Sequence, residues 1–145
     1  MSEERVLCTF RVAEHLLGLD ISVIQEVLRN QGVTRLPLAA PAVRGVINLR
    51  GRIVPALDLR RCLDIPVADA GCDDANIVVR EREEAPVSLL VDRIGDVVTV
   101  PSEACERVPE TIRGAARELI RGVFPLHDRL LLELDLGKVL RVAYA

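Results

Sequence analysis

An internal repeat restricts the possible folds of this 145-residue chain more than any other feature of its sequence. A pattern of Arg-Gly-Val, then Leu, Arg, Leu-Asp-Leu and a final Leu begins at Arg44 and returns, with its spacing unchanged, at Arg121. Upstream, residues 35–37 have a fainter counterpart at residues 107–109. Two similar units built from many short strands are typical of small closed sheets. We therefore predict a mainly β fold of two small β-barrels packed side by side, which limits exposed strand edges.

Period-two alternation and turn residues locate the expected elements. Residues 44–49 and 52–57 are two apolar segments joined at Arg50–Gly51, which predicts a β-hairpin, and Pro55 indicates an edge or a bulge in its second strand. Short helices are expected at residues 23–28, 59–63 and 136–140, capped by Ser22, Asp58 and Asp135. Other strands are expected at residues 6–12, 16–21, 33–36, 76–82, 86–91, 97–100, 123–124 and 130–134, with a helical or irregular segment at 102–119.

The length of the chain suits one domain, expected over residues 6–142. Its first barrel is predicted to cover residues 16–65 and its second barrel residues 76–142, and the strand at residues 6–12 fits either barrel. Residues 66–75 are polar and form a predicted surface loop that carries Cys72.

Composition argues against nucleic acid and membrane as partners. The net charge is −3, which provides no general attraction to nucleic acid or anionic lipid. Only Phe10, Phe124 and Tyr144 are aromatic, too few for a base-stacking surface. Neither a signal peptide nor a stretch of about 20 apolar residues is present, so we expect a cytoplasmic protein without membrane insertion.

No pattern of catalytic or metal-binding residues is recognisable. The four cysteines (Cys8, Cys62, Cys72 and Cys105) form no C-x-x-C pair, and His15 and His127 lie at no ligand spacing, so we expect buried small side chains, with no metal and no cofactor. Phosphate-binding loops, nucleophile elbows and zinc-protease motifs are all missing. Asp58 and Asp135 hold equivalent positions in the two copies, where helix capping accounts for both. The sequence therefore predicts a non-enzymatic protein.

Comparison of the two copies separates scaffold from function. Positions shared by both are explained by turn geometry, capping and core, whereas the hairpin tips differ: Asn48-Leu49-Arg50-Gly51 in one and Pro125-Leu126-His127-Asp128 in the other. Because the barrel does not require an arginine at this tip, Arg50 is a candidate contact for another protein.

Residues 45–60 (GVINLRGRIVPALDLR) resemble the signature of the CheW-like family of chemotaxis coupling proteins. Residues 19–27, 35–41, 89–94 and 130–140 also match this family, in order, although residues 13–17 lack its usual Gly-rich turn and aromatic. The resemblance implies two intertwined SH3-like five-stranded barrels. It also implies an adaptor that links transmembrane chemoreceptors to the CheA-type histidine kinase, through the kinase's own CheW-like regulatory domain, in receptor arrays at the inner face of the membrane.

The resemblance also suggests partner-binding residues. Ile24, Glu26 and Arg50 match family positions associated with receptor binding, in a groove between the barrels. Gly45, Val46 and Asn48 lie in the same groove segment. Glu26 and Arg50 can pair with each other across this groove, and Ile24 fits a core position equally well.

Other functions remain open from the sequence. An adaptor of the same fold can serve an array that controls a pilus or a second messenger, and an enzyme or a nucleic-acid-binding barrel is a further alternative. Because arrays depend on many weak contacts, we expect a monomer in isolation.

Overall fold

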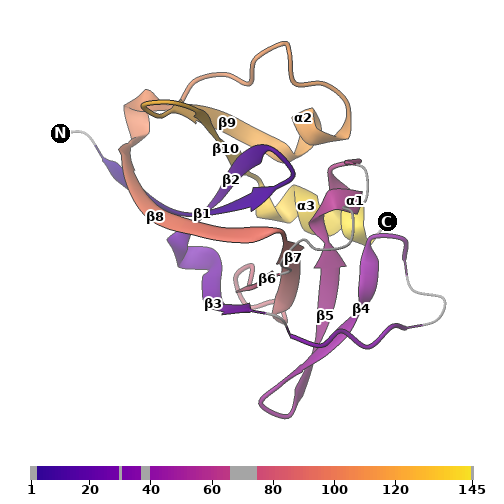
Figure 1. Cartoon of the computed structure of the whole chain (residues 1–145). Helices are drawn as coiled ribbons and strands as arrows, with labels where there is room; N and C mark the ends of the chain where they lie inside the picture. Colours follow the sequence, from indigo (N-terminus) through magenta and orange to yellow (C-terminus); the bar gives the residue numbers. More distant parts are fainter. Residues whose placement is uncertain (1–2, 30, 37–39, 66–74, 145) are drawn as a thin grey trace.

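Two five-stranded sheets dominate the computed structural model, which describes residues 3–29, 31–36, 40–65 and 75–144 (Figure 1). The first sheet has the strand order β8-β1-β2-β10-β9, with β8 Arg93–Pro101, β1 Glu4–Val12, β2 His15–Asp20, β10 Leu130–Leu134 and β9 Ile120–Pro125. The second has the order β3-β6-β7-β5-β4, with β3 Ile24–Arg29, β6 Ala75–Val79, β7 Val87–Val91, β5 Arg52–Asp58 and β4 Val43–Leu49. The predicted fold class is confirmed.

The predicted barrel boundaries differ from the sheets. Residues 24–91 supply the whole second sheet, whereas the first sheet combines residues 4–20 with residues 93–134. Strand β2 therefore belongs with β10, not with the first hairpin, and β6 and β7 belong with β5. The physical reason is that each repeated hairpin pairs in parallel with a strand from outside the repeat: β5 with β7, and β10 with β2. The 66–74 part of the predicted loop, with Cys72, lies outside the described residues.

The repeat seen in the sequence is also a repeat in three dimensions. Thr34 bridges to Val46 through two backbone hydrogen bonds of 2.8 Å, and Glu106 bridges to Val123 in the same way. Asp58 N donates to Ala42 O, and Asp135 N donates to Leu119 O, both at 2.8 Å. The fainter sequence echo upstream of each copy thus marks two segments that pack equivalently on β4 and β9.

Local sequence explains the short helices. Asp58 caps α1 (Leu59–Cys62) by accepting from Arg60 N, and Asp135 caps α3 (Leu136–Ala143) by accepting from Lys138 N, as predicted. Helices η1 (Ile21–Val23), η2 (Ser102–Ala104) and α2 (Ala115–Leu119) complete the described elements.

The expected helix at residues 23–28 is wrong. Asp20, not Ser22, caps the single turn η1, and its carboxylate accepts from Ser22 N. Residues Ile24–Arg29 then form strand β3, which pairs with β6 and contains a bulge between Ile24 and Glu26. Pairing with the buried strand β6 satisfies the backbone hydrogen bonds of this segment, whereas a helix of two turns is too short to be stable by itself. The β-branched residues Ile24 and Val27 also favour a strand.

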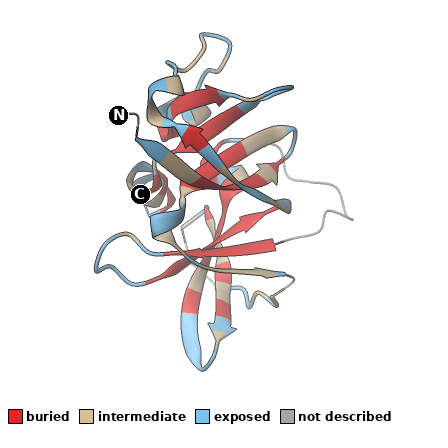
Figure 2. Cartoon of the chain, turned by 90° about the vertical axis from the view of Figure 1, so that its left-hand side faces the viewer, coloured by how far each residue is buried: buried red, intermediate tan, exposed pale blue. Residues whose placement is uncertain are grey.

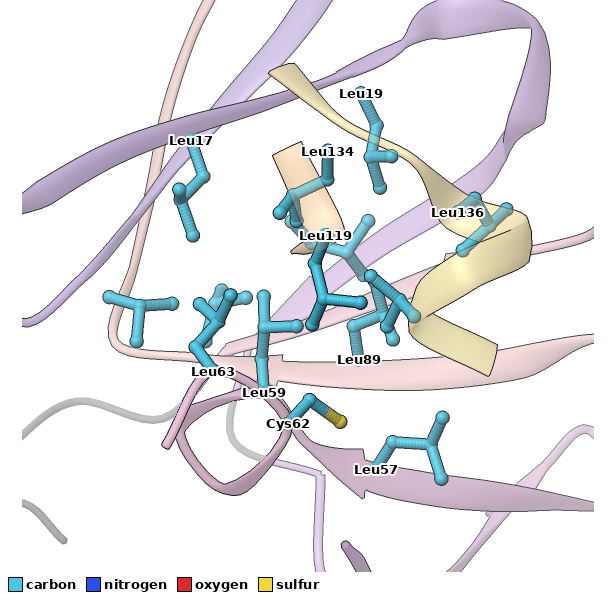
Figure 3. Close-up of a cluster of buried hydrophobic side chains, with 14 of the residues drawn as sticks. Leu17, Leu19, Leu57, Leu59, Cys62, Leu63, Leu89, Leu119, Leu134 and Leu136 are labelled. Carbon is cyan, nitrogen blue, oxygen red and sulfur yellow. The ribbon is translucent and has the colours of Figure 1, made fainter. Parts of the chain in front are cut away.

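One main core is shared by both sheets and the helices between them. It includes Leu17 and Leu19 from β2, Leu57 and Leu89 from the other sheet, and Leu136 from α3 (Figure 3). Most inward faces of the strands are buried, while the tip of the β4–β5 hairpin stands exposed away from them (Figure 2). A small separate core of Ile47, Val54, Ala56 and Leu90 supports the base of this hairpin.

Candidate functional site

An ion pair joins strand β3 to the tip of the β4–β5 hairpin. Nη1 of Arg50 donates to Oε2 of Glu26 at 2.9 Å, and Nη2 donates to Oε1, so the guanidinium and the carboxylate meet in a two-point contact. The Arg50 side chain is nonetheless 73% exposed, and that of Glu26 is 21% exposed. The structure therefore contains the pairing that the sequence allows, and Arg50 is still accessible from solvent.

The backbone of the hairpin turn fixes the position of Arg50. Arg50 and Gly51 both have positive φ, 52° and 84°, which is the geometry of a two-residue type I′ turn. Oδ1 of Asn48 accepts from Gly51 N at 2.9 Å and supports the turn. Asn48 is exposed, so it serves the turn and also belongs to the accessible surface of the tip.

The remaining candidate residues lie deeper. Gly45 is buried, and a Cβ there would overlap the carbonyl of Thr34, so close packing of two chain segments requires this glycine. Val46 is half-buried opposite Pro55. Ile24 is half-buried and packs on the main core. Thus Glu26, Asn48 and Arg50 gather at the hairpin tip, whereas Gly45 and Ile24 support the scaffold beneath it.

Pro55 lies where the hairpin extends beyond its sheet. Strand β5 pairs with β7 only from Ala56 to Asp58, so residues Arg52–Pro55 pair with β4 alone. The sequence-based expectation of an edge-like position for Pro55 fits this part of the strand, where one side lacks a ladder partner and the missing N–H costs nothing.

Two clefts lie beside the repeated hairpins. One, of about 730 Å³, lies between Pro55, the β6–β7 turn and α3, and includes Leu140 and Tyr144. The other, of about 440 Å³, lies between β10, the β1–β2 turn and residues 111–112. The two clefts differ in their third wall, which is helix α3 in the larger and residues 111–112 in the smaller.

Two aspartates whose roles are not predictable from the sequence join chain segments where the chain passes between the sheets. Asp92 accepts from Nε of Arg60 at 3.1 Å and from Ala13 N at 2.7 Å, which joins α1 to the β1–β2 turn. Asp20 accepts from Arg5 at 3.2 Å and from Ser22 N at 2.9 Å. Burial opposes the charge of Asp20, but the hydrogen bonds from Ser22 and Arg5 prevail and hold its pKa below its ordinary value. Asp20 is the last residue of an apolar strand and Asp92 directly follows one, and this position is the sequence signal that indicates a carboxylate at the end of a strand.

Two buried cysteines, Cys8 and Cys62, have thiols that are less easily ionised than a free thiol. Burial, and secondarily the nearby Asp58 charge, raises the pKa of the Cys62 thiol to about 11, and burial also raises the pKa of Cys8. Among the described residues, no group of three or more His, Cys, Asp or Glu side chains is arranged to hold a metal ion. None of the helices in the described part of the chain is long and apolar enough to cross a membrane.

Comparison with known proteins places this arrangement in a family. The CheW-like domain model matches residues 7–143. The chain is 31% identical over 140 residues to chemotaxis protein CheW of Treponema pallidum, covering 94% of this chain and 82% of that protein. It is 26% identical over 115 residues to protein PilI of Pseudomonas aeruginosa, covering 79% of this chain and 64% of that protein.

The solved structures agree with the sequence relatives. The scaffolding protein TtCheW of Thermoanaerobacter tengcongensis superposes with a TM-score of 0.80 at 26% identity, covering 92% of this chain and 90% of that one. The chain therefore belongs to the CheW-like family, which confirms the sequence-based prediction of a non-enzymatic adaptor of chemotaxis.

Proposed function

We propose that the chain couples the cytoplasmic tips of chemoreceptors to a CheA-type histidine kinase, and that the hairpin tip with Arg50, Glu26 and Asn48 contacts the receptor. The observation that carries this assignment is the exposure of Arg50 on a rigid turn, at a position that differs in the second copy of the repeat. A guanidinium held by a two-point ion pair keeps further N–H groups for a partner carboxylate.

The other groove residues contribute indirectly. Gly45 sets the packing of β4 on the Thr34 segment, Val46 lies on the same strand, and Ile24 fixes the start of β3 on the core. Together they hold Glu26 and the hairpin tip in register. The chain acts in the cytoplasm, is recruited to receptor arrays and is a monomer in isolation.

The test uses Arg50→Glu. An exposed ion pair contributes about 0–1 kcal/mol to stability, so this variant should fold with a nearly unchanged unfolding midpoint. It should lose affinity for a soluble receptor-tip fragment while keeping its affinity for the kinase's CheW-like domain. A folded Arg50→Glu variant with wild-type receptor affinity would remove the assignment, and a stable dimer in micromolar sedimentation runs would contradict the monomer.

A second candidate function is an adaptor in an array with a non-chemotactic output, such as a pilus or a second messenger. The similarity to protein PilI favours it. Affinity for receptor and kinase fragments from a chemotaxis system, compared with those from a pilus-control system, separates the two functions.

A further inference from the structure

We propose that Ile53 is the apolar anchor of the receptor-docking surface, and that the docked receptor segment places an apolar side chain on Ile53 beside a carboxylate that reaches Arg50. This inference rests on the proposed receptor contact of the hairpin tip and adds the residue that determines its affinity.

The exposure of Ile53 is the first observation. Its relative exposure is 66%, greater than that of any other large hydrophobic residue in the described segments, where the next is Val97 at 55%. Single exposed aliphatic residues are common on protein surfaces, so exposure alone carries no function. The position of Ile53 within the hairpin supplies the second observation.

Ile53 lies on the open face of the projecting hairpin. It pairs across the ladder with Asn48, and side chains of paired positions lie on the same face, so Ile53 and Asn48 are neighbours. The opposite face carries Ile47 and Val54, which pack on Leu90. Ile53 precedes the part of β5 that pairs with β7, so no strand in the described part of the chain pairs with it on that side. The tip of the β4–β5 hairpin projects away from its sheet (Figure 1).

The surroundings of Ile53 match the usual composition of an energetic centre in an interface. Such centres place an apolar anchor among polar groups that exclude water when the partner binds. Asn48 lies across the strand from Ile53, and the Arg50–Glu26 pair lies at the adjoining turn. The same face continues through Pro55 into the cleft of about 730 Å³ beside α3, which provides further contact area.

The positive charge at the hairpin tip favours an acidic partner segment. Two exposed cations, Arg50 in the turn and Arg52 directly after it, lie at the tip, and among the described residues Arg50 pairs with the carboxylate of Glu26. A partner carboxylate can therefore share Arg50 with Glu26 or contact Arg52, whereas a basic segment would be repelled. The occupant is an acidic receptor segment with an exposed aliphatic or aromatic side chain.

The repeat offers a matched control. Leu130 occupies in the second hairpin the position of Ile53 in the first, and it too is exposed, at 42%. Its cross-strand partner is Pro125 in place of Asn48, and His127 stands where the first copy has Arg50. Ile53→Ala and Leu130→Ala thus remove similar aliphatic side chains from equivalent scaffold positions, and only the first alters the proposed anchor.

The experiment measures affinity for a soluble receptor-tip fragment, with thermal unfolding of each variant. Ile53→Ala should weaken binding at least tenfold, Ile53→Leu should stay within about threefold of wild type, and Leu130→Ala within about twofold, with unfolding midpoints changed little. If Ile53→Ala binds like wild type while Arg50→Glu binds weakly, the anchor is wrong and the receptor contact stands. If wild-type protein fails to bind the fragment, the proposed function and the anchor fall together.

Discussion

The backbone of Thr34 lies directly against Gly45, so that two segments of the chain meet where no side chain separates them. Glu106 and Gly122 repeat this relationship in the second half, where a Cβ on Gly122 would lie 2.6 Å from Sγ of Cys105 and 3.1 Å from Glu106 O. The glycine that the two copies of the repeat share is therefore explained by close packing of two chain segments.

Gly45→Ala should destabilise the protein by about 2–3 kcal/mol or more, because the added methyl group collides with the Thr34 backbone, which cannot rotate away. Gly122→Ala should reduce the free energy of unfolding by less, since the closest neighbour of the added methyl group is the movable side chain of Cys105. Gly32→Ala is the control, because a Cβ there meets nothing within 4 Å, and it should change stability by less than about 0.5 kcal/mol. Urea unfolding of the three variants, analysed at a common slope, measures these differences. A wild-type midpoint for Gly45→Ala would contradict the close packing.

Removal of the Asp92 carboxylate should be far more damaging than removal of the Glu26 carboxylate. The side chains of Arg60 and Asp92 are only 11% and 14% exposed, and Asp92 also accepts from Ala13 N. Asp92→Ala leaves a largely buried guanidinium and a backbone N–H with a lost acceptor, which should cost about 2–4 kcal/mol.

Glu26→Ala is the matched comparison, since it breaks an ion pair whose arginine is exposed, and it should cost less than about 1 kcal/mol. Denaturant unfolding of both variants provides the measurement. If Asp92→Ala and Glu26→Ala reduce the free energy of unfolding equally, Asp92 does not hold α1 against the β1–β2 turn.

The elements that the sequence predicts correctly are those set by neighbouring residues. The Arg50–Gly51 turn, the caps Asp58 and Asp135 and the two hairpins all follow from local backbone preferences. The placement of Glu26 and Arg50 on opposite sides of one groove allows an ion pair between them, and the structure contains it.

Sheet membership was not predictable because it depends on pairing between distant segments. The parallel pairs β5–β7 and β10–β2 join strands from different parts of the chain, and the repeat does not include β2 or β7. The apolar residues Ile24, Val27 and Leu28 have the i, i+3, i+4 spacing of a helix, because the bulge between Ile24 and Glu26 interrupts the alternation of strand β3, and only pairing with β6 makes this segment a strand. The exposure of Ile53 is not predictable from the sequence because an isoleucine in a strand indicates burial.

Cysteine reactivity should distinguish exposed from buried thiols. Cys105 is exposed, whereas Cys62 and Cys8 are buried and have raised pKa values, about 11 for Cys62. Since the thiolate is the reactive form, iodoacetamide at pH 8 should modify Cys105 quickly in native protein and Cys62 only after unfolding. Peptide mapping by mass spectrometry at successive times measures this order. Rapid native labelling of Cys62 would show that its side chain, at the end of α1, is not buried in the main core.

Stability in acid should depend on Asp20, which clamps the passage from β2 to β3. Hydrogen bonds from Ser22 and Arg5 outweigh the effect of burial and lower the folded-state pKa of Asp20 below its ordinary value of 3.8. The unfolded chain therefore binds a proton at Asp20 at a higher pH than the folded chain does, so the stabilisation is fully present above that ordinary pKa and disappears as the pH falls through the folded pKa.

Asp20→Asn should lower stability at neutral pH, where the wild type has a charged clamp, and should show a shallower loss of stability than wild type below about pH 4. Asp64→Asn removes an exposed carboxylate at a position whose positive φ of 56° asparagine also tolerates, so its pH profile should follow that of wild type. Urea unfolding at pH values from 2.5 to 7 compares the three proteins, within the range where ordinary carboxylates titrate. If Asp20→Asn and wild type lose stability in parallel below about pH 4, another carboxylate controls the acid transition and the Arg5–Asp20 contact does not hold the passage between the sheets.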